Sequence, residues 1–188
     1  MGEAKVKGVA FRTIDTCFFE LRGAKMHAKA RELMFDDVRK PFESGLILPA
    51  SWYPIGWYRE VFRAFRAASG DGLELPRQIG YQAVKRDMAS VYKMIFVRIV
   101  SPQTLLSLSS RLFSTYYDTG AFDVVESRKG YVHVKLSGCM GWDANMWTEI
   151  YGSCLSMLEL AGAKEIRLRT RSGGRDHDTD TELEAYWV

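Results

Sequence analysis

The chain has 188 residues, of which 47% are hydrophobic and 26% are charged, and its formal net charge is +3. This composition is typical of a globular protein and excludes a disordered or low-complexity chain. The length suits one domain with a sizeable core, so we expect a single domain over residues 1–188. The net charge is too small to indicate a nucleic-acid partner.

The cysteines and the first residues favour a reducing compartment. Cys17, Cys139 and Cys154 lie far apart, and their odd number argues against a disulfide framework. The start MGEAKVKGVAF carries charges where a signal peptide has an apolar run. The longest uncharged stretch, residues 46–58, contains two prolines and is shorter than the ~18 apolar residues of a spanning helix. We therefore expect a cytoplasmic protein without a membrane span.

Residues 1–120 are predicted to form a mainly helical half. Residues 6–35 read as two short helices divided at Gly23, and residues 36–45 hold a short helix interrupted by Pro41. Apolar residues at helical spacing predict more helices further along the chain. These helices are expected after Pro54, over residues 76–90, over residues 91–100, and from Ser101 to the residue before Gly120.

Residues 51–58, SWYPIGWY, place four aromatic side chains at a helix start. Proline suits the first helical position and disfavours helical geometry at the residue before it, so Tyr53 is expected to cap a helix that begins at Pro54. Trp52 and Trp57 then occupy the two sites of a hydrophobic staple, which fixes the angle at which a chain enters a helix. This arrangement leaves the hydroxyls of Tyr53 and Tyr58 to face a pocket or a partner.

Residues 121–188 are predicted to form a ββαββ half. The runs FDVVES and YVHVKLS flank the turn RKG and read as a hairpin with Val124 opposite Val132. The runs IRLRTR and DTELEAYW carry alternating charges of opposite sign, so a second hairpin is expected with Arg169 opposite Glu182.

Between these hairpins, a helix is expected over residues 146–161, and Gly152 within it allows a neighbour to approach closely. Two hairpins joined by a single helix cannot build a wholly parallel sheet. We therefore expect an α/β protein of the α+β type, with N-terminal helices packed on one face of a mostly antiparallel sheet.

The candidate catalytic residues are Cys139, which follows a strand in SGCMGW and is expected to be exposed, and His133 nearby in sequence. No orienting partner or oxyanion loop accompanies them, and Asp123 opposite His133 reads as a surface ion pair. Cys154 lies on an apolar helical stripe, where a thiol has a raised pKa and poor access. An enzyme using Cys139 and His133 is therefore an alternative and not the leading prediction.

Two further patterns have both a functional and a structural explanation. The loop RDHDTD at 175–180 offers carboxylate and imidazole ligands for a metal, but its composition equally describes a solvated hairpin loop. Arg59, Arg63 and Arg66 lie beside aromatic residues and could contact phosphate or nucleic acid, although a solvated helix face explains them with less assumption. Phosphate-binding glycine motifs are absent from the sequence. We expect neither a metal nor a cofactor.

Several short motifs resemble an uncharacterised family of cytoplasmic proteins that is expanded in myxobacteria. The motifs are VKG at 6–8, SWYP at 51–54, SP at 101–102, LFSTYYDTG at 112–120 and LELAGAK at 158–164. The resemblance spans nearly the whole chain and implies no activity.

The order of elements in the second half also resembles the superfamily of haem-nitric-oxide-binding, 4-vinyl-reductase and TRAPP-type domains. This resemblance implies a ligand-binding or adaptor fold with an apolar cavity between helices and sheet. The haem-binding members carry a Tyr-x-Ser-x-Arg signature, and the nearest segment here, Tyr151 to Leu155, lacks the arginine. Neither His27 nor His133 stands out as an axial ligand, and the cysteine-rich patch of the vinyl-reductase type is absent from the sequence.

The leading prediction is a non-enzymatic regulatory or adaptor module that binds a small apolar ligand or a protein partner, and the partner can be a second copy of the chain. The aromatic residues that we expect to contact the ligand or the partner are Tyr53, Trp57, Tyr58, Trp142 and Trp147.

Overall fold

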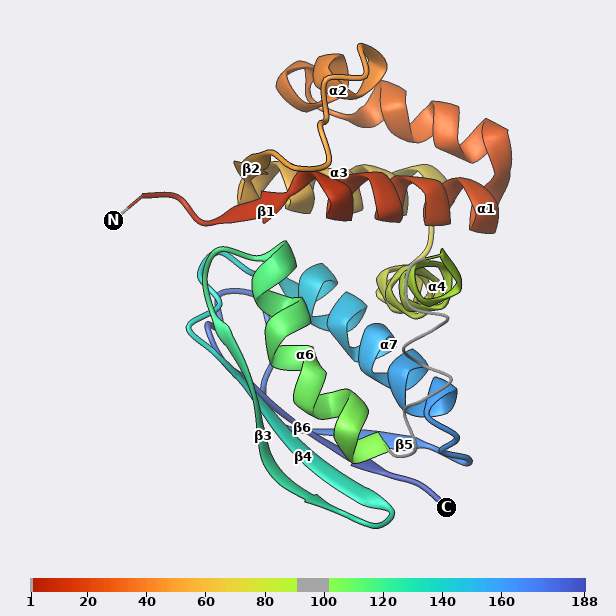
Figure 1. The fold of residues 1–188 in the computed structure, drawn as a ribbon. Helices are drawn as coiled ribbons and strands as arrows, with labels where there is room; N and C mark the ends of the chain where they lie inside the picture. Colours follow the sequence, from red (N-terminus) through yellow and green to blue (C-terminus); the bar gives the residue numbers. More distant parts are fainter. Residues whose placement is uncertain (1, 91–101) are drawn as a thin grey trace.

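The computed structural model describes residues 2–90 and 102–188 (Figure 1). The helix expected over residues 91–100 lies outside the described residues. The elements are β1 (Lys5–Lys7), α1 (Gly8–Leu33), α2 (Asp36–Glu43), β2 (Trp52–Pro54), α3 (Ile55–Ser69), α4 (Glu74–Ser90), α6 (Pro102–Tyr116), β3 (Ala121–Arg128), β4 (Tyr131–Ser137), α7 (Ala144–Leu160), β5 (Arg167–Gly173) and β6 (Thr181–Tyr186).

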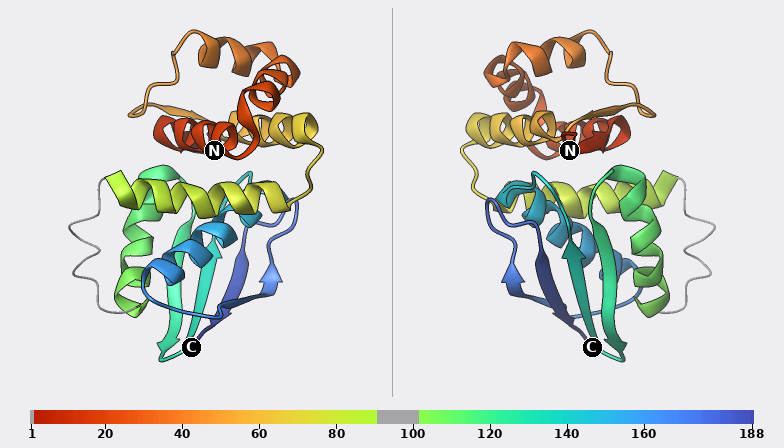
Figure 2. Two further views of the ribbon diagram at one scale, coloured as in Figure 1. Left: turned by 90° about the vertical axis from the view of Figure 1, so that its right-hand side faces the viewer. Right: turned by 90° about the vertical axis from the view of Figure 1, so that its left-hand side faces the viewer.

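The elements form two layers (Figures 1 and 2). An N-terminal layer contains β1, α1, α2, β2 and α3, and a C-terminal layer contains α4, α6, α7 and a four-stranded sheet. The sheet has the order β3-β4-β6-β5, and every neighbouring pair is antiparallel. The helices lie on one face of this sheet, with α4 between the sheet-covering helices and the N-terminal layer. The predicted α+β architecture with a ββαββ second half is therefore confirmed.

The VKG and SWYP segments lie side by side, because β1 pairs with β2 and Val6 lies opposite Tyr53. The backbone N–H of Gly8 donates to the Ser51 carbonyl at 2.8 Å. A Cβ atom at Gly8 would lie 2.0 Å from the Leu48 carbonyl oxygen, so the close approach of these two segments requires glycine.

The predicted helix start at SWYP is wrong by one residue. Helix α3 begins at Ile55 with Pro54 as its capping residue, because residues 52–54 are extended and paired with β1. Trp52 lies beside the ammonium of Lys7, and Trp57 stacks on Tyr53 with ring centroids 5.7 Å apart. The aromatic contact at this helix start is therefore Tyr53 with Trp57, and not Trp52 with Trp57.

The expected division of residues 6–35 at Gly23 is seen as a sharp kink within α1. Gly23 has φ 77°, a left-handed conformation that glycine adopts at little cost. The kink folds the second part of α1 back over α3 in the N-terminal layer (Figure 1).

Helices α4 and α7 pack with their backbones almost in contact. A Cβ atom at Gly152 of α7 would lie 2.0 Å from the carbonyl oxygen of Arg77, and one at Gly80 of α4 would lie 1.9 Å from that of Glu149. The Ser153 hydroxyl donates to the Gly80 carbonyl at 3.2 Å. The predicted close approach at Gly152 is confirmed. It fixes the position of Glu149 relative to α4.

The first hairpin has a different register from the predicted one. Val124 lies opposite Val134 and not opposite Val132. The chain turns within residues 129–130, which shifts the pairing beside the turn by three residues, and a bulge between Val124 and Glu126 reduces this shift to two. Neither the tight turn nor the bulge is visible in the alternation of apolar residues.

The second hairpin differs from prediction for the same reason. Arg169 lies opposite Glu184 and not opposite Glu182, because the loop after Gly173 returns to the sheet at Thr181 and sets a different register, which the bulge between Thr170 and Ser172 changes by one residue. The bulged residue, Arg171, reaches Glu182 at 4.0 Å and Glu184 at 3.8 Å. Opposite charges do meet across this hairpin, although through partners other than the predicted ones.

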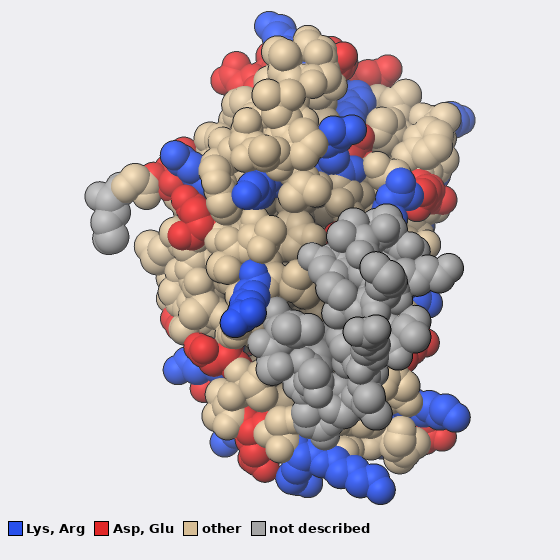
Figure 3. Space-filling model, viewed as in Figure 1, with Lys and Arg blue, Asp and Glu red and all other residues tan. Residues whose placement is uncertain are grey.

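The surface mixes both signs of charge. On the face seen in Figure 3, lysine and arginine side chains are interspersed with aspartate and glutamate. Among the described residues, no helix has the length and apolarity needed to cross a bilayer.

Candidate functional site

A cavity of about 110 Å³ lies where the two layers meet. Helices α1 and α3 line it from the N-terminal layer, and α4, α6, α7 and β3 line it from the C-terminal layer. Its lining is mostly apolar and aromatic, which is typical of small-molecule sites. The described lining residues are Ala10, Thr13, Ile14, Tyr58, Ala83, Val84, Asp87, Ser109, Leu112, Phe113, Tyr116, Tyr117, Phe122, Glu149, Ile150, Ser153 and Met157.

Glu149 of α7 is the central polar group of this cavity. Its side chain is buried, and its Oε1 accepts a hydrogen bond from the Tyr58 hydroxyl of α3 at 2.8 Å. Its Oε2 has no hydrogen-bond partner among the described residues. Burial raises the pKa of Glu149 to about 8, although the Tyr58 hydroxyl opposes the rise and the charge of Asp143 adds to it. At neutral pH the carboxyl is therefore mainly a neutral acid.

Tyr117 brings a second hydroxyl toward this carboxyl. Burial raises the pKa of Tyr117 well above its ordinary value, and the charge of Glu149 raises it further. The backbone position of Tyr117 is set by a β-bridge to Val6 of β1, and the neighbouring Asp118 accepts a hydrogen bond from the Lys5 backbone at 2.6 Å. The first strand of the chain thus holds one wall of the cavity.

Asp87 of α4 is a second carboxyl in the lining. It accepts a hydrogen bond from the Tyr116 hydroxyl at 3.1 Å. Burial raises the pKa of Asp87, while the Tyr116 hydroxyl and the nearby Arg86 lower it. Among the described lining residues, none is lysine, arginine or histidine.

The predicted aromatic residues divide between this cavity and other places. Tyr58 lines the cavity, and its role in binding stays a prediction. Trp142 packs behind Tyr117, with their ring centroids 4.8 Å apart. The ring centroid of Trp147 lies 4.6 Å from that of Trp142.

Tyr53 and Trp57 lie away from this cavity. The Tyr53 hydroxyl donates to the Leu46 carbonyl and accepts from the Leu48 backbone, each at 2.8 Å. These bonds give Tyr53 a structural role in the loop before β2, and the Trp57 ring stacks on it.

The expectation that Cys139 is exposed is wrong. Cys139 is fully buried, its backbone N–H donates to the Thr179 carbonyl, and burial raises the pKa of its thiol to about 12. His133 lies opposite Glu126 and contacts Glu182 with Nε2 at 3.0 Å, so its expected pairing with Asp123 is also wrong. A thiol that stays protonated is a poor nucleophile.

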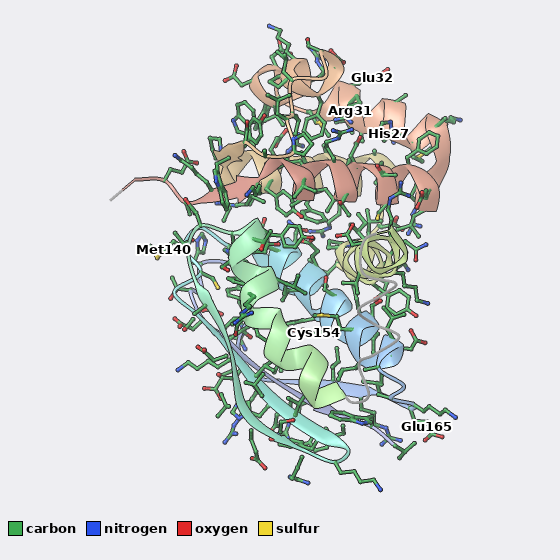
Figure 4. The ribbon with its side chains drawn as sticks, in the orientation of Figure 1. His27, Arg31, Glu32, Met140, Cys154 and Glu165 are labelled. Atoms are coloured by element: carbon green, nitrogen blue, oxygen red, sulfur yellow. The ribbon has the colours of Figure 1, made fainter. Side chains whose placement is uncertain are left out.

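Cys154 is buried in α7, as expected from its apolar stripe, and burial raises the pKa of its thiol to about 12. Figure 4 shows Cys154 in the C-terminal layer and His27 in the N-terminal layer, where His27 contacts Asp15 at 2.8 Å. The described residues contain no group of three or more His, Cys, Asp or Glu side chains able to hold a metal ion.

The three arginines of α3 each have a partner. The Arg63 guanidinium donates to both carboxylate oxygens of Glu60, at 2.6 Å and 2.7 Å. Arg66 donates to the Asn145 side chain at 2.9 Å, and Arg59 lies 3.6 Å from Asp143. These contacts tie α3 to the start of α7 and use the charges that a phosphate would otherwise meet.

Two larger surface grooves are more polar than the cavity. One, of about 780 Å³, lies between α4 and the end of α7 and includes Arg77 and Glu159. The other, of about 430 Å³, lies beside Arg66, Asp143 and Asp176 at the start of α7. Neither includes the buried carboxyl, so the cavity is the better candidate site.

Glu149 was missed from the sequence, although a signal for it exists. Within α7, residues 144–158 include one charged side chain, that of Glu149. The predicted stripe through Trp147 and Cys154 covers one side, while Met146, Gly152 and Ser156 on other sides are also buried. A lone charge in a helix that is buried all round indicates a functional or paired group.

No protein-family model and no curated protein matches the chain, so the resemblance to the myxobacterial-type family stays a prediction. Solved structures do match. An iron(II) unliganded H-NOX protein from K. algicida, a single-residue variant, is 15% identical with TM-score 0.74, covering 97% of this chain and 96% of its own.

A variant H-NOX from T. Tengcongensis is 13% identical with TM-score 0.67, covering 96% of this chain and 97% of its own. An oxygen-binding H-NOX domain related to soluble guanylate cyclases is 13% identical with TM-score 0.67, covering 96% and 94%. At these identities the likeness concerns the fold alone. The chain has the fold of H-NOX domains.

Proposed function

We propose that this protein is a non-enzymatic regulatory module whose cavity binds a small, largely apolar ligand. The observation that carries the proposal is the cavity between the two layers, where a buried carboxyl oxygen of Glu149 has no hydrogen-bond partner among the described residues and the walls are apolar and aromatic. Buried polar atoms normally have a partner, and an exception calls for a ligand, a water or a functional explanation. A ligand that contacts both layers can also change how they pack.

The residues present do not fit haem. Two of the H-NOX neighbours are described as an iron(II) protein and as an oxygen-binding domain. Here the lining among the described residues has neither histidine nor cysteine, and His27, His133 and His177 all lie outside it. The cavity of about 110 Å³ is also far below the ~300–1,000 Å³ of pockets for drug-sized ligands. A porphyrin needs more space and an axial ligand.

The size of the cavity suits a molecule of a few heavy atoms. A dry apolar cavity of ~150 Å³ accepts benzene or xenon in another protein. The ligand class is therefore a small molecule with an apolar body, in agreement with the prediction from sequence.

A cavity-filling variant tests this proposal. In Ala83→Leu the added side chain projects from α4 toward the cavity, and small ligands that raise the melting temperature of the wild type should no longer do so. Ala28→Leu makes the same chemical change at an exposed position of α1 and should keep the ligand response. Native mass spectrometry of freshly purified protein measures retained ligand directly. Equal ligand retention by Ala83→Leu and the wild type would rule the cavity out as the site.

A reconstitution experiment tests the conclusion about haem. After mixing with haemin and gel filtration, the protein should carry no stoichiometric haem absorption. A stable complex with one haem per chain would show that an axial ligand had been overlooked.

A protein partner is the second part of the proposal, since a regulatory module acts by passing its ligand state to another surface. Phe35 before α2 and Leu46 and Leu48 after it are large apolar side chains that are more than half exposed. Sedimentation velocity at high protein concentration tests self-association. A strict monomer with and without ligand would remove a second copy of the chain as the partner.

A further inference from the structure

We propose that the cavity binds a small organic amine as its ammonium ion, with Glu149 as the counter-ion and the surrounding aromatic rings as its walls. This inference rests on the proposed function, because it names the ligand class of the same cavity.

The first argument is the carboxyl itself. Glu149 is 6% exposed, and the Tyr58 hydroxyl already occupies Oε1. Oε2 lacks a hydrogen-bond partner at bonding distance among the described residues, although the Tyr117 hydroxyl is near enough to lower the pKa of the carboxyl, so Oε2 can accept a hydrogen bond from a ligand. A buried carboxylate is stable only when it is paired with a cation, and an ammonium group supplies both the charge and the hydrogen bond.

The second argument is the charge of the lining. Asp87 adds a second carboxyl, and lysine, arginine and histidine are absent from the lining among the described residues. An anionic ligand would therefore meet two acids and no described cation. A cationic ligand meets carboxyl groups, which take the opposite charge when they ionise.

The third argument is the aromatic wall. The rings of Tyr58, Phe113, Tyr116, Tyr117 and Phe122 all line the cavity. The faces of such rings attract cations, and the attraction is stronger where the contact is desolvated. Aromatic walls with a carboxylate at one end are therefore complementary to an alkylammonium ion.

Binding of an ammonium ion should release a proton from the protein. The titratable groups that act on Glu149 are Tyr58 of α3, Tyr117 after α6 and Asp143 before α7, and Glu149 in turn acts on Cys17 of α1. With a pKa of about 8, Glu149 is mainly protonated at pH 7, and only the ionised fraction can pair with the ligand. The proton leaves Oε2 for the solvent as the ammonium binds.

Isothermal titration calorimetry with isobutylamine and isobutanol tests the inference. These probes have the same number of heavy atoms and differ in charge. Isobutylamine should bind the full-length protein ~10-fold more tightly at pH 7 than at pH 6, and ~5-fold more tightly again at pH 8, because the ionised fraction of Glu149 rises. Isobutanol should show no such gain, because a neutral hydroxyl requires no ionised carboxyl.

Variants separate the cavity from the surface. Glu149→Gln keeps an oxygen for the Tyr58 hydroxyl and removes the charge, so its affinity for isobutylamine at pH 8 should fall at least ~10-fold, while its affinity for isobutanol stays within ~3-fold. Glu184→Gln removes another tyrosine-bonded carboxylate on the outer face of the sheet and should leave both affinities unchanged. The wild-type pH profile provides a test that does not depend on the folding of any variant.

The outcomes distinguish this inference from the proposed function. Isobutylamine binding that rises with pH and is lost in Glu149→Gln supports the inference. Binding of isobutanol without isobutylamine, or isobutylamine affinity that falls with rising pH, overturns the amine and leaves the cavity as a site for neutral ligands. If neither probe binds, both the inference and the proposed function fail.

Discussion

Among the described residues, two buried glutamate side chains accept a hydrogen bond from a tyrosine. In the cavity, the Tyr58 hydroxyl donates to Glu149 at 2.8 Å, and on the outer face of the sheet the Tyr131 hydroxyl donates to Glu184 at 3.0 Å. The pKa of Glu149 is raised to about 8, mainly by burial. The pKa of Glu184 is lowered, first by the Tyr131 hydroxyl and then by Arg171 against a smaller effect of burial.

A tyrosine hydroxyl lowers the pKa of both carboxyls, so the opposite outcomes come from burial, which outweighs the hydroxyl at Glu149 and does not outweigh it at Glu184. Glu184 is only 8% exposed, yet the Tyr131 hydroxyl donates to it and the guanidinium of Arg171 lies 3.8 Å away. Glu149 lies between two layers of helices with an oxygen unpaired. Glu184 has hydrogen-bond and ion-pair partners and is a structural contact. The Oε2 atom of Glu149 has no hydrogen-bond partner among the described residues, and a ligand can bind to it.

The largest expected effect is on the pH dependence of stability. Between pH 4.5 and about 8 the folded protein holds a proton on Glu149 that the unfolded chain has lost, so stability falls as pH rises. The shift from 4.5 to about 8 sets an upper limit of ~5 kcal/mol on this loss, at ~1.4 kcal/mol for each pKa unit. Glu149→Gln should remove most of it, as measured by urea unfolding at pH 5, 7 and 9.

Glu184→Gln is the matched comparison for that prediction. Because the pKa of Glu184 is lowered in the folded state, its carboxylate stabilises the protein above the ordinary pKa, and this contribution is lost as pH falls. The variant should therefore be less stable than the wild type at pH 7, with a smaller deficit in acid. A change in stability of the same sign in both glutamine variants at pH 9 would contradict the opposite pKa shifts of the two carboxyls.

The next effect is expected where α4 supports Glu149. A methyl group at Gly152 would lie 2.0 Å from the Arg77 carbonyl oxygen, so Gly152→Ala must push α4 and α7 apart. We expect a loss of ~3 kcal/mol in the free energy of unfolding and weaker ligand binding in the cavity. Gly72→Ala has open space around the added methyl group and should stay within ~1 kcal/mol of the wild type. Equal stability of the two variants would show that the helices are not packed this closely.

The smallest effect is expected from removing a hydroxyl. Tyr58→Phe leaves Oε1 of Glu149 without its described donor inside the cavity and should cost ~1–3 kcal/mol in the free energy of unfolding. Tyr131→Phe should cost less, because Arg171 and solvent remain beside Glu184. Thermal unfolding of the two variants at pH 7 measures the order, and a larger loss for Tyr131→Phe would contradict it.

The sequence predicted the fold class because apolar periodicity and turn residues report directly on helices and hairpins. It identified the division of α1 at Gly23 and the close approach at Gly152, since glycine marks both. The hairpin registers were wrong because the turns lie at residues 129–130 and between Gly173 and Thr181, positions that the alternation of side chains does not report, and the bulges at Val125 and Arg171 change each register by one more residue.

The candidate site was predicted less well than the fold. Tyr58, which was expected to face a pocket or a partner, lines the cavity, and Tyr117 and Asp87 reach the same cavity from other parts of the chain. Their meeting depends on the packing of α3, α4, α6 and α7, which no local pattern reports. Cys139 was expected to be exposed because it follows a strand. Its backbone N–H donates to the Thr179 carbonyl, and its side chain is buried.

A direct measurement of the two carboxyl pKa values tests the account most closely. Carbon-13 NMR of glutamate-labelled protein, with Glu149→Gln and Glu184→Gln used to assign the two signals, follows each carboxyl through a pH titration. The account predicts a midpoint near 8 for Glu149 and a midpoint below 4.5 for Glu184. A Glu149 midpoint at its ordinary value of 4.5 would contradict the neutral buried acid and, with it, the proposed basis of ligand binding.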